Sequence, residues 1–148
     1  MEFHGAKVAI FIGDQLLVLL RDDFDHIPFP ACWDFAGGGR EAGETPEQCA
    51  LREVKEEFGL TLAAYQLVGK VAYETTNPKG LAAFFAAHLP LGTEEGISFG
   101  EEGQRWELMS PDDYLTRNDA IAHLQGCLRV YLERLSQHGL AGFRGLSL

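Results

Sequence analysis

Short apolar runs separated by polar, turn-forming segments make up most of the chain. Gly13-Asp14 separates the first two runs and suits a two-residue hairpin turn. A glycine run at residues 37–39 follows the short apolar segment 33–35, where three glycines let the backbone turn sharply or approach a ligand closely. The apolar runs predict strands, the earliest two as a buried hairpin, at residues 6–12, 15–20, 33–35, 65–73, 81–89 and 104–109.

Helix signals enclose residues 46–58. Thr45 suits the N-cap, Pro46 the first helical position, and Gln48 can complete a capping box. Gly59 is a typical stop signal. The segment therefore predicts a helix between the third and fourth apolar runs.

A second helix is predicted near the end of the sequence. Apolar residues recur there at spacings of three and four from Ile121 to Leu135, which is typical of an amphipathic helix packed on a core. Ser110-Pro111 predicts a short helical turn just before it. The order of elements predicts an α/β fold, with a mixed β-sheet sandwiched between α-helices in one domain over residues 1–148.

Composition narrows the class of protein. The chain has 148 residues and 46% hydrophobic content, enough for one globular core, and no apolar run long enough to span a bilayer. Its N-terminus lacks the basic start of a secretory signal, so we expect a cytoplasmic protein without a membrane partner. The net charge of −10 argues against stable nucleic-acid binding. Cys32, Cys49 and Cys127 have neither disulfide nor zinc-site spacing.

Three glutamates share one face of the predicted helix 46–58. At roughly 100° per residue, Glu53, Glu56 and Glu57 fall within about a third of the circumference, beside the apolar stripe. A solvated helix face is one interpretation. However, neighbouring carboxylates near the C-terminal half of a helix repel each other and oppose its dipole. A divalent cation such as Mg²⁺ or Mn²⁺ would remove that conflict.

The spacing around these glutamates resembles a known family signature. Gly38 is followed after five residues by Glu44, and after seven more by REVKEEFGL, residues 52–60. This is similar to the Nudix hydrolase box, G-x5-E-x7-R-E-U-x-E-E-x-G-U, with every specified position matched over residues 38–60. The order of predicted elements extends the resemblance to about residues 6–137.

The resemblance implies roles for the residues of the box. Glu53, Glu56 and Glu57 would be metal ligands and catalytic residues, with Glu53 a candidate base for the attacking water. Arg52 would orient the carboxylates through charge-assisted hydrogen bonds. Three further residues of the box would have structural roles and hold the loop and the helix ends: Gly38, Glu44 and Gly59. The implied cofactor is Mg²⁺, with Mn²⁺ as an alternative, and the number of ions stays open.

Residues outside the box complete the predicted site. Family members often recruit another acidic residue from a downstream loop, and here that loop offers Glu101 and Glu102. The resemblance of Glu102-Gly103-Gln104 to MutT-type members favours Glu102 as a further metal ligand or base. The candidates for substrate contact are basic residues for phosphate and aromatic residues for a base: Arg21, Arg40, Trp33 and Tyr73.

By this resemblance, the leading hypothesis is metal-dependent hydrolysis of a phosphoanhydride in a nucleoside diphosphate linked to another moiety, such as a dinucleotide or a sugar nucleotide. A MutT-like nucleoside triphosphate pyrophosphohydrolase is the alternative within the enzyme class. A catalytically silent nucleotide-binding or regulatory module is the alternative of another class. Many family members dimerise, so the resemblance also allows a homodimer.

Overall fold

The computed structural model describes residues 2–76 and 78–140. Within these residues a seven-stranded mixed sheet forms, with the order β3-β2-β1-β6-β5. β4 pairs with β1, and β7 pairs with β2. The strands are β1 Gly5–Ile12, β2 Gln15–Leu20, β3 Trp33–Asp34, β4 Ala36–Gly39, β5 Val68–Thr76, β6 Lys79–Leu89 and β7 Arg105–Met109.

Strand β1 organises the sheet because three strands pair with it. It runs parallel to β6 and antiparallel to β2 and β4. Its first half, Gly5 to Val8, pairs with β4, and its second half, Ile10 to Ile12, pairs with β2. The chain that enters α1 is therefore anchored on the central strand.

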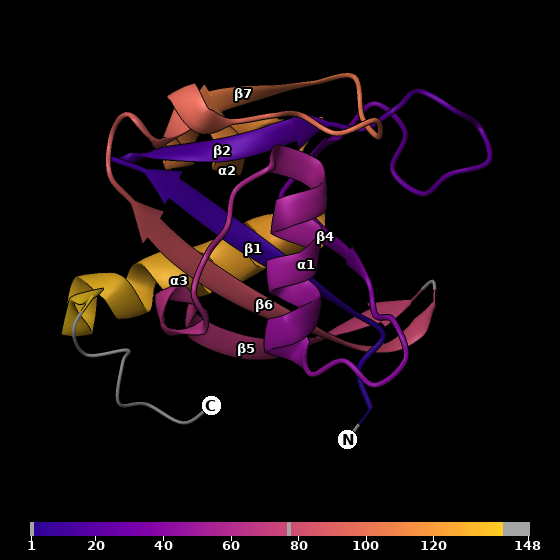
Figure 1. The fold of residues 1–148 in the computed structure, drawn as a ribbon, viewed down its shortest axis with the longest axis horizontal. Helices are drawn as coiled ribbons and strands as arrows, with labels where there is room; N and C mark the ends of the chain where they lie inside the picture. The colour runs from indigo at the N-terminus through magenta and orange to yellow at the C-terminus, as the bar shows by residue number, and fades with distance from the viewer. Residues whose placement is uncertain (1, 77, 141–148) are drawn as a thin grey trace.

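Helices cover both faces of this sheet, as Figure 1 shows. α1 (Pro46–Phe58) lies on one face, and α3 (Ala122–His138) lies on the other beside the short α2 (Pro111–Thr116). Two single-turn 3₁₀ helices, η1 (Ala64–Gln66) and η2 (Thr93–Gly96), lie in the connections. The predicted α/β/α arrangement is confirmed.

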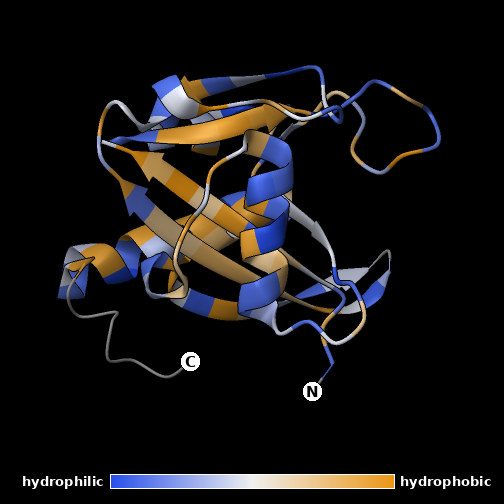
Figure 2. Ribbon diagram, viewed as in Figure 1, coloured by the Kyte–Doolittle hydropathy of each residue, from blue (hydrophilic) through white to orange (hydrophobic). Residues whose placement is uncertain are grey.

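The two faces of the sheet bury separate apolar clusters. Along β1, Val8 and Ile10 face the cluster that includes α1, whereas Ala9 and Phe11 face the cluster that includes α3. This alternation follows from the two-residue period of a strand. Figure 2 accordingly shows apolar strands between helices that carry polar residues. No helix in the described part of the chain is long and apolar enough to cross a membrane.

Two sequence predictions differ from the structure. Residues 65 and 66 belong to η1, and the strand predicted from residue 65 begins at Val68 and continues to Thr76. Residues 37–39, whose three glycines suit either a sharp turn or a close approach to a ligand, form most of β4 instead of a turn. Pairing with β1 holds them in a strand, a long-range interaction that local glycine flexibility does not reveal.

Candidate active site

The three predicted glutamates lie on α1, whose ends form as the local signals predict. The Thr45 side chain accepts from the Gln48 backbone N–H, the Gln48 side chain completes the capping box, and Gly59 ends the helix in a left-handed conformation. Val54 and Phe58 face the core from the same helix. Since these contacts fix the rotation of the helix about its axis, the glutamates lie at the rim of the core, as predicted.

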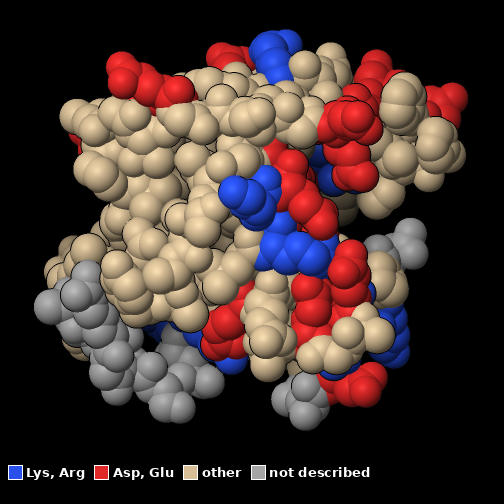
Figure 3. Space-filling model, viewed as in Figure 1, with Lys and Arg blue, Asp and Glu red and all other residues tan. Residues whose placement is uncertain are grey.

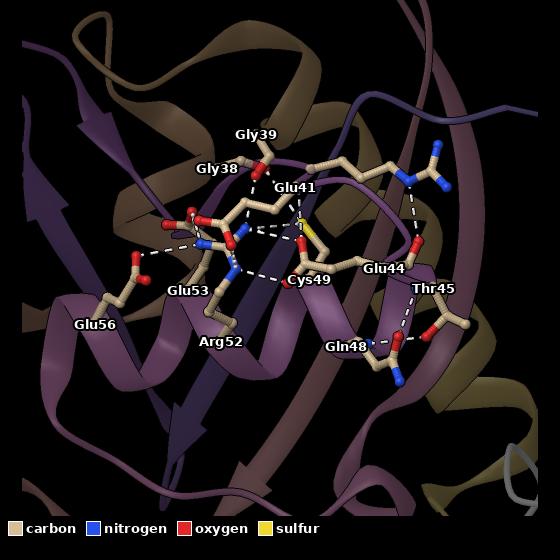
Figure 4. A network of polar contacts seen from close by, with 11 residues as sticks. Gly38, Gly39, Glu41, Glu44, Thr45, Gln48, Cys49, Arg52, Glu53 and Glu56 are labelled. Atoms are coloured by element: carbon tan, nitrogen blue, oxygen red, sulfur yellow. Dashed lines mark hydrogen bonds and ion pairs between the residues drawn. The ribbon is translucent and has the colours of Figure 1, made fainter.

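Arg52 is the centre of a network that joins this helix to the preceding loop, shown in Figure 4. Its Nε donates to Glu44 Oε2 at 2.6 Å, and its Nη2 donates to Glu44 Oε1 at 3.0 Å and to the Gly39 carbonyl at 2.8 Å. Its Nη1 donates to Glu53 Oε1 at 2.8 Å and to Glu56 Oε2 at 3.2 Å. One guanidinium therefore orients two of the three glutamates.

The glycines of β4 bring backbone against Glu57, which Arg52 does not contact, and against Glu53. Gly37 N donates to Glu57 Oε1 at 2.6 Å. At Gly38, a Cβ atom would lie 2.7 Å from the Glu53 carboxyl carbon. A side chain at residue 38 would therefore displace the Glu53 carboxylate, which explains why glycine is needed there.

Burial disfavours the ionised form of two of these carboxylates, Glu53 and Glu57. Burial raises the pKa of Glu57 to about 8, although Lys7 and the Gly37 N–H act in the opposite direction. Burial also raises the pKa of Glu53, opposed chiefly by Arg52. The protein thus places carboxylates where their charges need a compensating cation.

The loop that carries Glu101 and Glu102 is fastened over this face. Gly100 N donates to the Glu57 carbonyl at 2.9 Å, which ties the loop to the last turn of α1. On its other side, Gly103 N donates to Asp22 Oδ2 at 3.0 Å. Both loop glutamates are exposed and line the same cavity as the helix glutamates.

A polar cavity of about 570 Å³ lies over the carboxylate face. Acidic and basic side chains gather on the surface above α1, as Figure 3 shows. The residues that line the cavity come from β1, β4, α1, the 100–102 loop and the position just after β2; they are Lys7, Arg21, Gly37, Gly38, Gly39, Glu53, Glu56, Glu57, Gly100, Glu101 and Glu102.

A second cavity of about 600 Å³ adjoins the first and is more apolar. Tyr73 lines it and stacks on His123, with ring centroids 5.5 Å apart. Phe29 lies edge-on to His123 at 5.6 Å. Arg21 lines both cavities. The structure thus brings together two of the predicted substrate residues, Arg21 and Tyr73.

The other two predicted substrate residues lie outside the lining of both cavities. Arg40 donates from Nε to the Glu44 carbonyl, and its guanidinium lies 4.8 Å from the Phe3 ring centroid. Trp33 is 3% exposed and lies beneath the guanidinium groups of Arg105 and Arg117. These contacts give Arg40 and Trp33 structural partners within the protein.

Sequence reasoning missed Lys7, Asp34 and His123, which all line the apolar cavity. Lys7 was visible as a lone charge in the apolar run of residues 6–12, and Asp34 as a charge between two aromatic residues. His123 offered no such signal, because helical spacing at the surface does not reveal which side chains border a cavity.

The donor set suits a hard divalent cation, because Glu53, Glu56, Glu57 and Glu102 supply only carboxylate oxygens and border one cavity. However, within residues 2–76 and 78–140 no three His, Cys, Asp or Glu side chains converge at metal-binding spacing. Glu53 points to Arg52, and Glu57 points to Gly37. Coordination of one ion by several of these carboxylates therefore requires side-chain rotation.

Comparison with known proteins places this chain in a family. A profile described as NUDIX domain matches residues 3–126. The 8-oxo-dGTP diphosphatase of Escherichia coli is 36% identical over 93 residues, which cover 60% of this chain and 69% of that protein. The ADP-ribose pyrophosphatase of Methanocaldococcus jannaschii is 40% identical over 72 residues, covering 49% of this chain and 41% of that protein.

Solved structures share the fold. An Ap4A hydrolase of C. elegans superimposes with a TM-score of 0.71 at 24% identity, over 90% of this chain and 98% of that one. A MutT protein from Methanosarcina mazei superimposes with the same TM-score at 20% identity, over 90% of this chain and 97% of that one. At this identity the likeness concerns the fold alone.

Proposed function

Because the chain belongs to the Nudix family of pyrophosphohydrolases, we propose that it hydrolyses a phosphoanhydride bond of a nucleotide with the help of a divalent cation. The observation that carries this proposal is the face of α1. There Arg52 bonds to Glu44, Glu53 and Glu56, while Glu57 lies against the Gly37 N–H. A protein that only bound nucleotides would gain nothing from a set of repelling, partly buried carboxylates.

Glu53, Glu56 and Glu57 would hold the cation, with Glu102 approaching from the neighbouring loop. Mg²⁺ is the proposed ion, and Mn²⁺ has the same preference for oxygen ligands. Such an ion neutralises charge on the phosphoryl oxygens and lowers the pKa of a bound water. The chain itself supplies the orientation, since Arg52 bonds to both Glu53 and Glu56.

A general base is needed to accept a proton from the attacking water. Glu53 is our first candidate because it lies against the β4 backbone at the edge of the polar cavity, and because burial raises its pKa, which makes the carboxylate a better proton acceptor. Glu102 is the alternative, since it is exposed and lines the same cavity. The rest of the catalytic effect would come from positioning the substrate and the attacking water, because enzymes catalyse phosphoryl transfer largely by positioning and electrostatic stabilisation.

For the substrate, a nucleoside diphosphate linked to another moiety remains our first candidate. A similar relative named ADP-ribose pyrophosphatase supports this choice. A nucleoside triphosphate is the second candidate, and relatives named 8-oxo-dGTP diphosphatase in Escherichia coli and Haemophilus influenzae favour it. The two adjoining cavities have room for a nucleoside on one side and a phosphate chain on the other.

A substrate panel tests the proposal. The purified protein is incubated with ADP-ribose, nucleotide sugars, dinucleotides, nucleoside triphosphates and 8-oxo-dGTP, each with Mg²⁺ and with EDTA. Two monophosphate products indicate a diphosphate-linked substrate, whereas inorganic pyrophosphate with a nucleoside monophosphate indicates a triphosphate. Absence of Mg²⁺-dependent hydrolysis across the panel would overturn the proposal and favour the binding module.

A further inference from the structure

Lys7 lies at the junction of the two cavities. It lines both of them, together with Arg21, Gly38 and Gly39. The apolar cavity carries the ring wall of Tyr73, His123 and Phe29, whereas the polar cavity carries the glutamates of α1. A ligand that extends from the ring wall to the glutamates must therefore pass Lys7.

Asp34 holds Lys7 at this junction. Lys7 Nζ donates to Asp34 Oδ2 at 2.8 Å, and Arg21 Nη1 donates to the same oxygen at 3.0 Å. Asp34 is only 2% exposed, and its Oδ1 accepts from the Phe35 N–H. One buried carboxylate thus fixes two cations, and the three groups together carry one net positive charge.

Gly37 leaves the space through which the Lys7 side chain reaches the junction. A Cβ atom at Gly37 would lie 2.8 Å from Lys7 Cδ and 2.1 Å from the Ala6 carbonyl oxygen. The ammonium group has three donors, and within the described residues Asp34 is its hydrogen-bond acceptor. Donors therefore remain for an anionic group that enters from either cavity.

The ring wall fits a planar group. Tyr73 and His123 present stacked rings, and Phe29 is 44% exposed with a φ of 52°, a strained conformation for a non-glycine residue. Arg21 supports this loop by donating from Nε to the Pro28 carbonyl at 2.9 Å. Strain and an exposed ring beside an apolar cavity indicate a surface that contacts a ligand.

We propose that Lys7, positioned by Asp34 together with Arg21, binds the phosphate next to the nucleoside of a substrate whose base lies against Tyr73, His123 and Phe29. This inference rests on the proposed function, because it assumes a nucleotide with its cleaved bond over α1. It assigns Lys7 as a substrate-binding residue and Asp34 as a positioning residue. A single nucleoside occupies the apolar cavity, and its phosphate chain crosses Lys7 toward the glutamates.

Binding of nucleotides in the absence of metal tests the contact between Lys7 and the phosphate separately from catalysis. Calorimetry in EDTA compares AMP with adenosine and GMP with guanosine, so that each pair differs only by the phosphate. The wild type should bind at least one monophosphate more tightly than its nucleoside. Lys7→Gln keeps a donor for Asp34 but removes the charge, and should weaken monophosphate binding about tenfold, the effect of a charged hydrogen bond. Nucleoside affinity should not change.

Matched variants separate charge from fold. Lys7→Arg should retain the preference for monophosphate. Lys70→Met removes a lysine that pairs with Glu47 and lines neither cavity, so it should bind like the wild type. Asp34→Asn should weaken monophosphate binding while nucleoside binding persists, a difference that general destabilisation would not produce.

Two failures can be told apart. If the wild type hydrolyses a nucleotide with Mg²⁺ but binds no monophosphate better than its nucleoside, or if Lys7→Gln keeps that preference, the Lys7 assignment is overturned while the proposed function stands. If the wild type hydrolyses none of the nucleotides in the panel, the proposed function fails and the assignment fails with it.

Discussion

Arg52 and Glu44 form a two-point ion pair that joins the loop before α1 to the carboxylate face of that helix. The Nε–Oε2 and Nη2–Oε1 distances are 2.6 and 3.0 Å. The same guanidinium bonds to Glu53. A contact between two residues that are eight positions apart in sequence therefore helps to orient Glu53, a proposed metal ligand.

This ion pair makes stability depend on pH. Its hydrogen bonds lower the pKa of Glu44 from 4.5 to about 2, so the unfolded chain binds more protons between these values. The contribution of Glu44 is present above about pH 4.5 and is lost as the pH falls to about 2. Urea unfolding should show that Glu44→Gln is less stable than the wild type at neutral pH, with the gap closing in acid. A gap independent of pH would contradict the assignment.

The metal-site glutamates are tested by amide substitutions. Glu53→Gln and Glu57→Gln keep side-chain size but remove the charge, so each should lower turnover by about 100-fold or more. Circular dichroism should show that both variants remain folded, because the carboxylates lie at the rim of the core. Wild-type turnover in either variant would refute its role.

Metal should also stabilise the fold without any substrate. The wild type should melt at a higher temperature in Mg²⁺ than in EDTA, since a bound ion stabilises the folded state and offsets repulsion among the glutamates. A double variant, Glu53→Gln with Glu57→Gln, should lose most of this difference. An equal Mg²⁺ effect in both proteins would place the ion elsewhere.

Neighbouring glycines of β4 provide a matched pair. Gly38→Ala would put a Cβ atom 2.7 Å from the Glu53 carboxyl carbon, whereas at Gly39 the nearest atom is the His4 carbonyl oxygen at 4.0 Å. Turnover should therefore fall in Gly38→Ala and stay close to wild type in Gly39→Ala. Similar activity in the two variants would show that crowding of Glu53 does not matter.

Gly69 and Gly126 offer a contrast in stability. Gly69 has a φ of +64°, and a Cβ atom there would lie 2.6 Å from the Tyr131 ring, so Gly69→Ala should cost about 1–3 kcal/mol. Gly126 lies within α3 with nothing within 4 Å of the added atom, so Gly126→Ala should stabilise by about 0.5–1 kcal/mol. Denaturant unfolding measures both, and a stabilising Gly69→Ala would contradict the packing described.

The sequence by itself determined the helix that carries the glutamates. Thr45, Gln48 and Gly59 act within a few residues of the helix ends, so the bounds of α1 agree with the prediction. The shared face of Glu53, Glu56 and Glu57 follows from helical geometry alone. The spacing from Gly38 to Leu60 also predicted the family, which the comparisons confirm.

Only the tertiary structure decided what surrounds that face. Lys7 and Asp34 are 27 residues apart in sequence, and they meet because β4, which begins at Ala36 shortly after Asp34, pairs with β1. His123 joins them from α3, on the opposite side of the sheet from α1. Local signals cannot encode such neighbours, since long-range strand pairing and helix packing depend on the whole core. The sequence therefore predicts α1 and its three glutamates, but it does not predict which residues line the cavities beside them.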